Sequence, residues 1–78
     1  MTLADAKDGG VFVVVRMTDE RILTQGLRWG IVEGSYIEVQ KNIKNGPVII
    51  SKKHTEMAIG RELAKSVIVE PAEPAKKD

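Results

Sequence analysis

With 78 residues, the chain has room for one domain with a thin core, because a chain this short buries only about 60% of the surface that its unfolded form exposes. It contains no cysteine, which excludes disulfides, thiolate zinc sites and iron–sulfur clusters, and no apolar run is long enough for a membrane span or a signal peptide, so we expect a cytoplasmic protein that does not insert into the membrane. The 12 Lys and Arg residues against 11 Asp and Glu give a formal net charge of +1, too small for the positive field of a dedicated nucleic-acid-binding protein.

The first elements predicted along the chain are a strand and a short helix. Residues 9–17 are rich in β-branched side chains and begin with a glycine pair, which predicts a strand that is apolar on both faces and central in its sheet. Residues 18–29 then change to helical spacing: Thr18 can cap the helix, and Leu23 and Leu27 lie one turn apart.

Three glycines follow at intervals of four, at positions 26, 30 and 34. A loop that cradles phosphate would place them between a strand and the start of a helix, whereas here they lie inside and after a helix. Gly30 is therefore predicted to end the helix, with Ile31 completing a Schellman-type cap, and Gly34 to form a turn. Gly26 costs on the order of 1 kcal/mol relative to Ala within a helix, so we expect fraying or bending there.

The rest of the chain predicts a meander of strands. Residues 36–40 alternate between polar and apolar side chains, which is typical of a half-buried edge strand. The segments after it are a hairpin at Asn45–Gly46, strands at 47–51 and near 52–60, one or two helical turns at 60–65, a closing strand at 66–70 and a disordered tail at 71–78.

About five short strands with one short helix between the first two indicate an all-β fold, because near closure of the sheet is how so few strands avoid exposed edges. SH3-like and OB-like barrels are the two candidates. The position of the helix after the first strand favours a small, partly open SH3-like barrel, and we assign this domain to residues 1–70.

The order of several motifs resembles the FeoA family of ferrous iron transport proteins. These motifs are LADAKDG at residues 3–9, WGIVEG at 29–34, GPVIIS at 46–51 and MAIGRELAKSVIV at 57–69. The resemblance covers residues 3–70, and this chain departs from it at Gly26, where the family usually has a large apolar residue. It implies an SH3-like accessory protein that acts on the cytoplasmic side of the membrane GTPase FeoB and that is associated with transition metals.

An alternative comes from the SH3-like domain of metal-dependent repressors, which resembles this family. A regulatory or nucleic-acid-associated module of that kind would use the lysines around one hairpin, at positions 41, 44, 52 and 53. The low net charge and the lack of a recognition helix disfavour nucleic acid as the partner.

No catalytic constellation is evident, so we do not expect an enzyme. A nucleophile needs a base and an orienting group beside it. His54 is the only histidine, and Ser35, Ser51 and Ser66 would all have to share it.

No metal cofactor is required by the sequence, but a labile divalent iron or zinc ion is a hypothesis that His54 and Glu56 support. Structural zinc needs four ligands, which this chain lacks. Imidazole suits first-row ions, so His54 and Glu56 could form a weak site or share an ion with a neighbouring chain. The competing interpretation is that His54 is an ordinary solvated residue.

A binding surface is predicted at the helix end, formed by Leu27, Arg28 and Trp29, for a partner or for a second copy in a homo-oligomer. Trp and Arg are enriched among the residues that dominate interface energetics. Trp29 could equally belong to the core, because a domain of this size has few large apolar groups.

Overall fold

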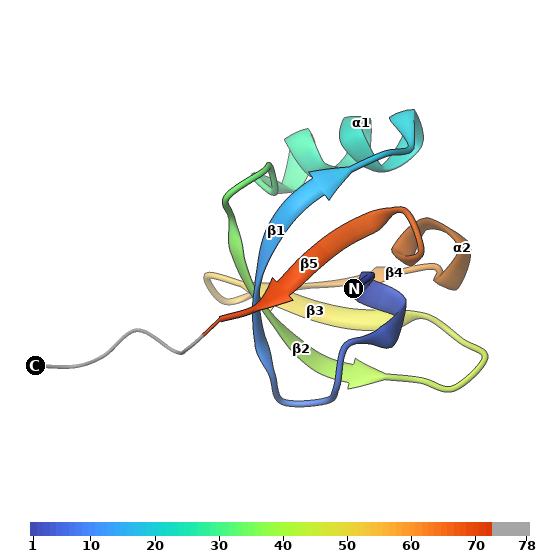
Figure 1. Cartoon of the computed structure of the whole chain (residues 1–78). Helices are drawn as coiled ribbons and strands as arrows, with labels where there is room; N and C mark the ends of the chain where they lie inside the picture. Colours follow the sequence, from blue (N-terminus) through green and yellow to red (C-terminus); the bar gives the residue numbers. More distant parts are fainter. Residues whose placement is uncertain (73–78) are drawn as a thin grey trace, which may run out of the picture.

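The computed structural model describes residues 1–72 as a single antiparallel sheet with short helices at its margins (Figure 1). The strand order in the sheet is β4-β3-β2-β1-β5. In chain order, the elements are a 3₁₀ turn η1 (Leu3–Asp5), β1 (Val11–Met17), α1 (Glu20–Trp29), β2 (Tyr36–Asn42), β3 (Val48–Lys52), β4 (Thr55–Ile59), α2 (Arg61–Ala64) and β5 (Val67–Pro71).

The predicted all-β, partly open SH3-like fold is confirmed. The sheet has five strands and curls around its core, but its two outer strands, β4 and β5, are not hydrogen-bonded neighbours. The predicted helix between the first two strands is α1, which lies at one end of the curled sheet (Figure 1). None of the helices in residues 1–72 has the length and apolar character needed to cross a membrane.

Two expectations about the strands are wrong. β2 is the middle strand and not an edge, because β1 and β3 both pair with it. β1 is not buried on both faces, because Val14 is 1% exposed whereas its neighbour Val15, on the other face, is 41% exposed. A register shift between Val14 and Arg16 against β5 accompanies this change, as expected for a bulge at which the strand turns.

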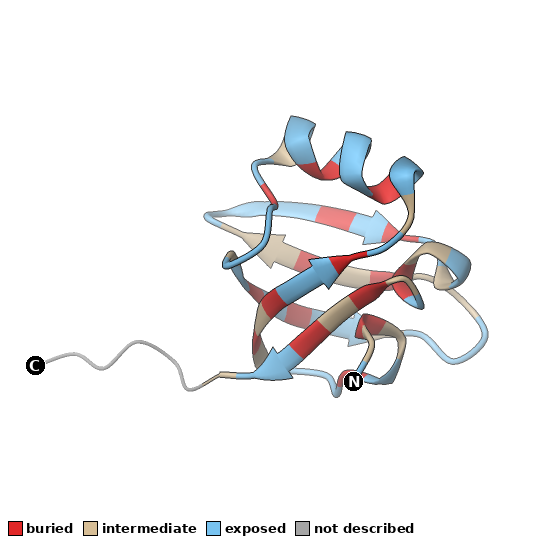
Figure 2. Cartoon of the chain, turned by 45° about the horizontal axis from the view of Figure 1, so that its top comes forward, coloured by how far each residue is buried: buried red, intermediate tan, exposed pale blue. Residues whose placement is uncertain are grey.

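The core lies on the inner face of the sheet, and along the strands buried residues alternate with intermediate or exposed ones (Figure 2). It is entirely apolar among the described residues, with no buried polar or charged side chain. The most deeply buried large side chains are Leu3, Val14, Ile22, Val39, Val48, Ile50 and Val69.

The ends of α1 are capped by backbone and side-chain groups that satisfy its orphan polar atoms. Asp19, and not Thr18 as predicted, is the N-cap, and its side chain accepts a hydrogen bond from the Arg21 amide. Thr18 instead continues the pairing of β1 with β5 through its amide and the Ser66 carbonyl. At the other end Gly30 has φ 75°, in the left-handed region, and donates its amide to the last turn, so the predicted glycine stop is confirmed.

Gly26 is buried on the inward side of α1, and the helix runs through it without interruption. A Cβ at this position would lie 2.6 Å from the Ile31 carbonyl oxygen and 3.6 Å from the Met17 sulfur. The Ile31 amide donates to the Gly26 carbonyl at 2.7 Å, which is the 6→1 hydrogen bond of a Schellman motif. The loop after α1 therefore packs on the bare backbone of the helix.

At its C-terminal end the domain extends slightly beyond the predicted boundary at residue 70. Pro71 is part of β5, and the Ala72 amide donates to the Val11 carbonyl at 2.8 Å. Pro71 thus belongs to the sheet, and Ala72 after it is hydrogen-bonded to β1. The rest of the predicted tail, residues 73–78, lies outside the described residues.

Arg61 at the start of α2 ties three segments of the chain together. Its guanidinium donates to the carbonyls of Gly46 at 2.9 Å, Ala4 at 3.1 Å and Ile43 at 2.6 Å, and to the side-chain oxygen of Asn42. The Asn42 side-chain amide in turn donates to the Ala4 carbonyl at 2.9 Å. The N-terminal turn, the β2–β3 loop and α2 are thereby held to one planar cation.

Candidate interaction surface

The three residues predicted to bind a partner lie at the end of α1, but they do not form one surface. Successive helical residues point about 100° apart, so Leu27 and Trp29 face nearly opposite sides of the helix. Leu27 is 71% exposed, and Arg28 beside it is also exposed. Trp29 is partly buried and packs against the core. The structure thus supports the core alternative for Trp29 and leaves Leu27 and Arg28 on the outside.

A groove that we call the α1 groove lies beside Leu27. It has a volume of about 330 Å³ and is lined by Met17, Leu23, Leu27, Val32 and Glu33. Leu23 is 40% exposed and Val32 is 44% exposed. Apolar side chains that gather on a small surface mark interaction sites more often than scattered ones do. Val32 could not be predicted as part of this groove from the sequence, where it is only an apolar residue between Gly30 and Gly34.

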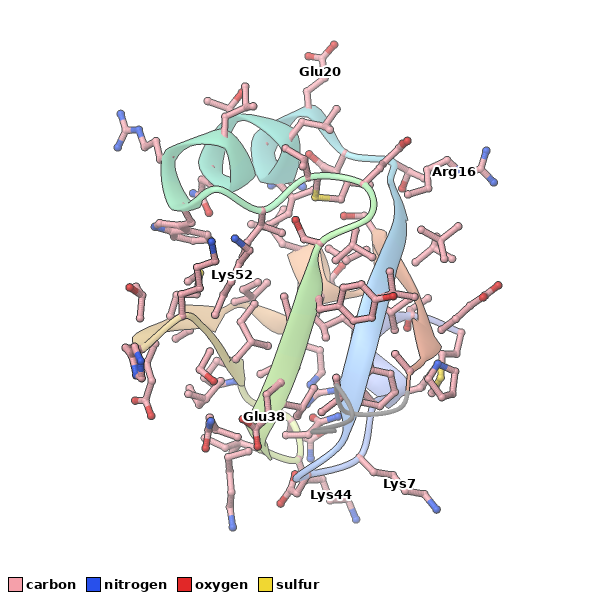
Figure 3. All side chains as sticks on the ribbon, turned by 90° about the vertical axis from the view of Figure 1, so that its left-hand side faces the viewer. Lys7, Arg16, Glu20, Glu38, Lys44 and Lys52 are labelled. Atoms are coloured by element: carbon pink, nitrogen blue, oxygen red, sulfur yellow. The ribbon has the colours of Figure 1, made fainter. Side chains whose placement is uncertain are left out.

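Charged residues flank the outer side of α1. Within residues 1–72 the ion pairs are Asp19–Arg21, Asp8–Lys41 and Glu62–Lys65, so neither Glu20 nor Arg28 has a partner there. The Glu20 side chain points away from the body of the molecule (Figure 3). The hydrogen bond from the Arg21 side chain lowers the pKa of Asp19 below its ordinary value, which keeps this pair charged and internally balanced.

His54 and Glu56 line a second, larger groove on the outer face of the sheet, of about 760 Å³, together with Tyr36 and Glu38 among others. His54 occupies the tight turn between β3 and β4, with φ 71°. Two donors complete only part of a coordination sphere. No group of three or more His, Cys, Asp or Glu side chains that could hold a metal ion occurs in residues 1–72.

None of the three serines considered as nucleophiles forms a hydrogen bond with His54 in the described part of the chain. The Ser35 hydroxyl accepts from the Val32 amide at 2.9 Å, and the Ser51 hydroxyl accepts from the Gln40 side chain at 2.8 Å. The Ser66 hydroxyl donates to a backbone carbonyl at 2.7 Å. Each hydroxyl thus has a local structural partner.

The fold is that of a small, open SH3-like barrel, with three of its exposed apolar residues, Leu23, Leu27 and Val32, beside one helix. The chain belongs to the FeoA domain family, whose model matches residues 1–71. It is 44% identical over 72 residues to the "Putative Fe(2+) transport protein A" of Methanocaldococcus jannaschii, a match that covers 91% of this chain and 87% of the relative.

Solved structures agree with this membership. An iron uptake regulatory protein, FeoA, superimposes with a TM-score of 0.81 at 28% identity, covering 92% of this chain and 96% of that one. The FeoA protein of Chlorobium tepidum gives a TM-score of 0.82 at 17% identity, covering 97% and 74%. The manganese regulator SloR shares the fold, with a TM-score of 0.80 at 16% identity, but this chain covers only 34% of its length.

Proposed function

We propose that this protein is a cytoplasmic accessory protein of ferrous iron transport that acts by binding the membrane GTPase FeoB, without catalysing a reaction of its own. Membership of the FeoA family and the name of the archaeal relative support the transport context. The observation that carries the binding role is the exposure of Leu27 beside the α1 groove.

The α1 groove has the features of a protein contact. Its apolar lining offers area whose burial favours association, at roughly 25 cal/mol per Å² before the costs of binding. Arg28 lies next to Leu27 on the exposed side of the helix and has no ion-pair partner in residues 1–72. We therefore assign Leu27 as the apolar anchor and Arg28 as the residue that confers charge specificity.

The test is capture of the purified cytoplasmic domain of the transporter by the immobilised protein. Arg28→Glu and Leu27→Asp should each weaken capture at least tenfold, while circular dichroism shows a folded domain. Lys44→Glu is the matched control, because Lys44 lies at the end of the molecule opposite α1 (Figure 3). Unchanged capture by both α1 variants would refute this surface.

A labile divalent iron or zinc ion at His54 and Glu56 remains part of the proposal. The two side chains line one groove, and an ion held there would take its other ligands from water or from the partner. The His54 ring signals should move in a nuclear magnetic resonance titration with zinc at sub-millimolar concentration. Signals that stay in place, with and without the transporter domain, would exclude this site.

The alternative of a regulatory or nucleic-acid-associated module draws on the shared fold of the manganese-dependent regulators. It predicts a shift of DNA mobility in a gel that becomes stronger as salt is lowered, because phosphate contacts release counterions. No shift at low salt would remove this alternative.

A further inference from the structure

The outer face of α1 carries opposite charges at its two ends. Glu20 is the first residue of the helix and Arg28 the ninth, and both are exposed. Their separation along the helix axis is about 12 Å, so they are too far apart to pair with each other. Neither has an ion-pair partner elsewhere in residues 1–72. The helix thus presents two unsatisfied charges of opposite sign at a fixed spacing.

Between these charges the same face carries a short side chain, with two leucines along one side of it. Thr24 lies midway between them and is exposed, so a second backbone can approach closely there. Leu23 and Leu27 lie together on one side of this face, 40% and 71% exposed, and border the α1 groove. The order along this face is an acid, a small residue and a base, at Glu20, Thr24 and Arg28.

Such an order is self-complementary for an antiparallel pair. A twofold axis that passes beside Thr24, perpendicular to the helix, places Glu20 of each copy opposite Arg28 of the other. The dimer therefore contains two such ion pairs. The same operation keeps both pairs of leucines on one side of the contact, so that Leu27 meets Leu23 of the second copy over the groove. The opposed helix dipoles also favour this arrangement.

We propose that a second copy of this chain binds to the outer face of α1 in a symmetric, antiparallel dimer. A twofold interface uses the same patch on both subunits, so the patch has to carry the complement of each of its own features. Here the patch has an exposed leucine and a groove, and a free acid and a free base. Arg21, on the edge of the same face, does not oppose this pairing, because Asp19 balances its charge at 2.7 Å.

The dimer does not depend on the proposed transport function, but it covers Leu27 and Arg28. Binding of the second copy and binding of FeoB at that surface therefore exclude each other. The dimer forms at concentrations above its dissociation constant, and dilution or binding of the transporter gives the monomer with the α1 groove open.

Charge reversal provides the test, read by sedimentation equilibrium. The wild-type protein should show a monomer–dimer equilibrium with a dissociation constant on the order of 10–100 µM, as expected for a small interface. Glu20→Arg alone and Arg28→Glu alone each turn two attractions into two repulsions and should weaken the dimer about tenfold or more. Lys44→Glu, far from α1, should leave the equilibrium unchanged.

Mixing the two variants gives the decisive result. A Glu20→Arg chain and an Arg28→Glu chain match at both contacts, so an equimolar mixture should regain association while each variant alone stays monomeric. The chain that carries both substitutions should dimerise with itself. A wild-type protein that is monomeric at about 1 mM, or a mixture that stays monomeric, would overturn the dimer.

These outcomes separate the dimer from the proposed function. A monomeric protein whose capture of the transporter domain is still lost with Arg28→Glu refutes only the dimer. A dimer that responds to charge reversal, with transporter capture unaffected, refutes only the proposed surface for FeoB. A dimer that Leu27→Asp does not weaken uses another face and also overturns this inference.

Discussion

Replacement of Arg61 by methionine should destabilise the domain more than any other single surface change, because one guanidinium satisfies four acceptors. It donates to three backbone carbonyls, of Ala4, Ile43 and Gly46, and to the Asn42 side chain. Methionine keeps the length of the side chain but none of the donors. Hydrogen bonds from a charged donor contribute about 1.5–3 kcal/mol each when buried, and water can replace part of this network, so we expect a total loss of about 2–4 kcal/mol.

For a domain of this size each kcal/mol shifts the melting temperature by about 4–8 °C, so Arg61→Met should lower it by about 10–30 °C in a circular dichroism melt. Arg61→Lys should lose less, because an ammonium reaches only some of the acceptors. Arg16→Met is the matched control: Arg16 extends into solvent (Figure 3), and its replacement should change stability by less than about 0.5 kcal/mol. If Arg61→Met lowers the free energy of unfolding by less than about 1 kcal/mol, the hydrogen bonds of Arg61 do not stabilise the domain as argued.

Three further changes test other parts of the structure. Gly26→Ala should lower the free energy of unfolding in urea by about 1 kcal/mol or more, because the added Cβ would meet the Ile31 carbonyl. This loss is expected although alanine has the higher helix propensity. A variant more stable than the wild type would contradict this packing. The pKa of Asp19 is lowered in the folded state, so its carboxylate stabilises the fold above about pH 4, and this stabilisation is lost as the pH falls through the folded pKa. The difference in melting temperature between wild type and Asp19→Asn should therefore shrink from pH 5 to about pH 2. A difference that stays constant over this range would exclude this linkage. Lys53 and His54 both have positive φ, at 50° and 71°, a conformation that Asn and Gly adopt at less cost. The double replacement Lys53→Asn with His54→Gly should therefore raise the free energy of unfolding by about 1 kcal/mol. A free energy of unfolding below that of the wild type in the same urea titration would contradict a strained turn.

Much of the fold could be predicted from local patterns. The alternation of β2, the apolar run of β1 and the glycine that ends α1 each have a local physical cause, and the structure has these elements close to the expected positions. The place of β2 in the middle of the sheet could not be predicted, because strand order depends on which surfaces meet after folding. The sequence does not distinguish Thr18 from Asp19 as the N-cap, since two adjacent residues of similar capping strength precede the helix.

The candidate surface was predicted only in part. The apolar spacing identified Leu27, but Trp29 lies nearly opposite on the helix and packs inward, a difference that residue type alone does not reveal. Arg61 appeared in the sequence as one member of a family motif. Its role is set by carbonyls from segments 15–57 residues away, which only the folded chain brings together.

The two unusual features of α1 explain each other. A helix selected only for stability would bury its leucines and expose its glycine, because burial of a leucine side chain is worth about 1.5–3 kcal/mol. Here Gly26 is buried, and Leu27 is the most exposed of the large apolar residues described. With Gly26 inward, the Ile31 carbonyl and Met17 lie close to the helix backbone, and both leucines lie on the exposed side of the helix. Exposure of Leu27 leaves its apolar side chain in water and adds nothing to the stability of the isolated domain, so we infer that a binding partner covers this surface.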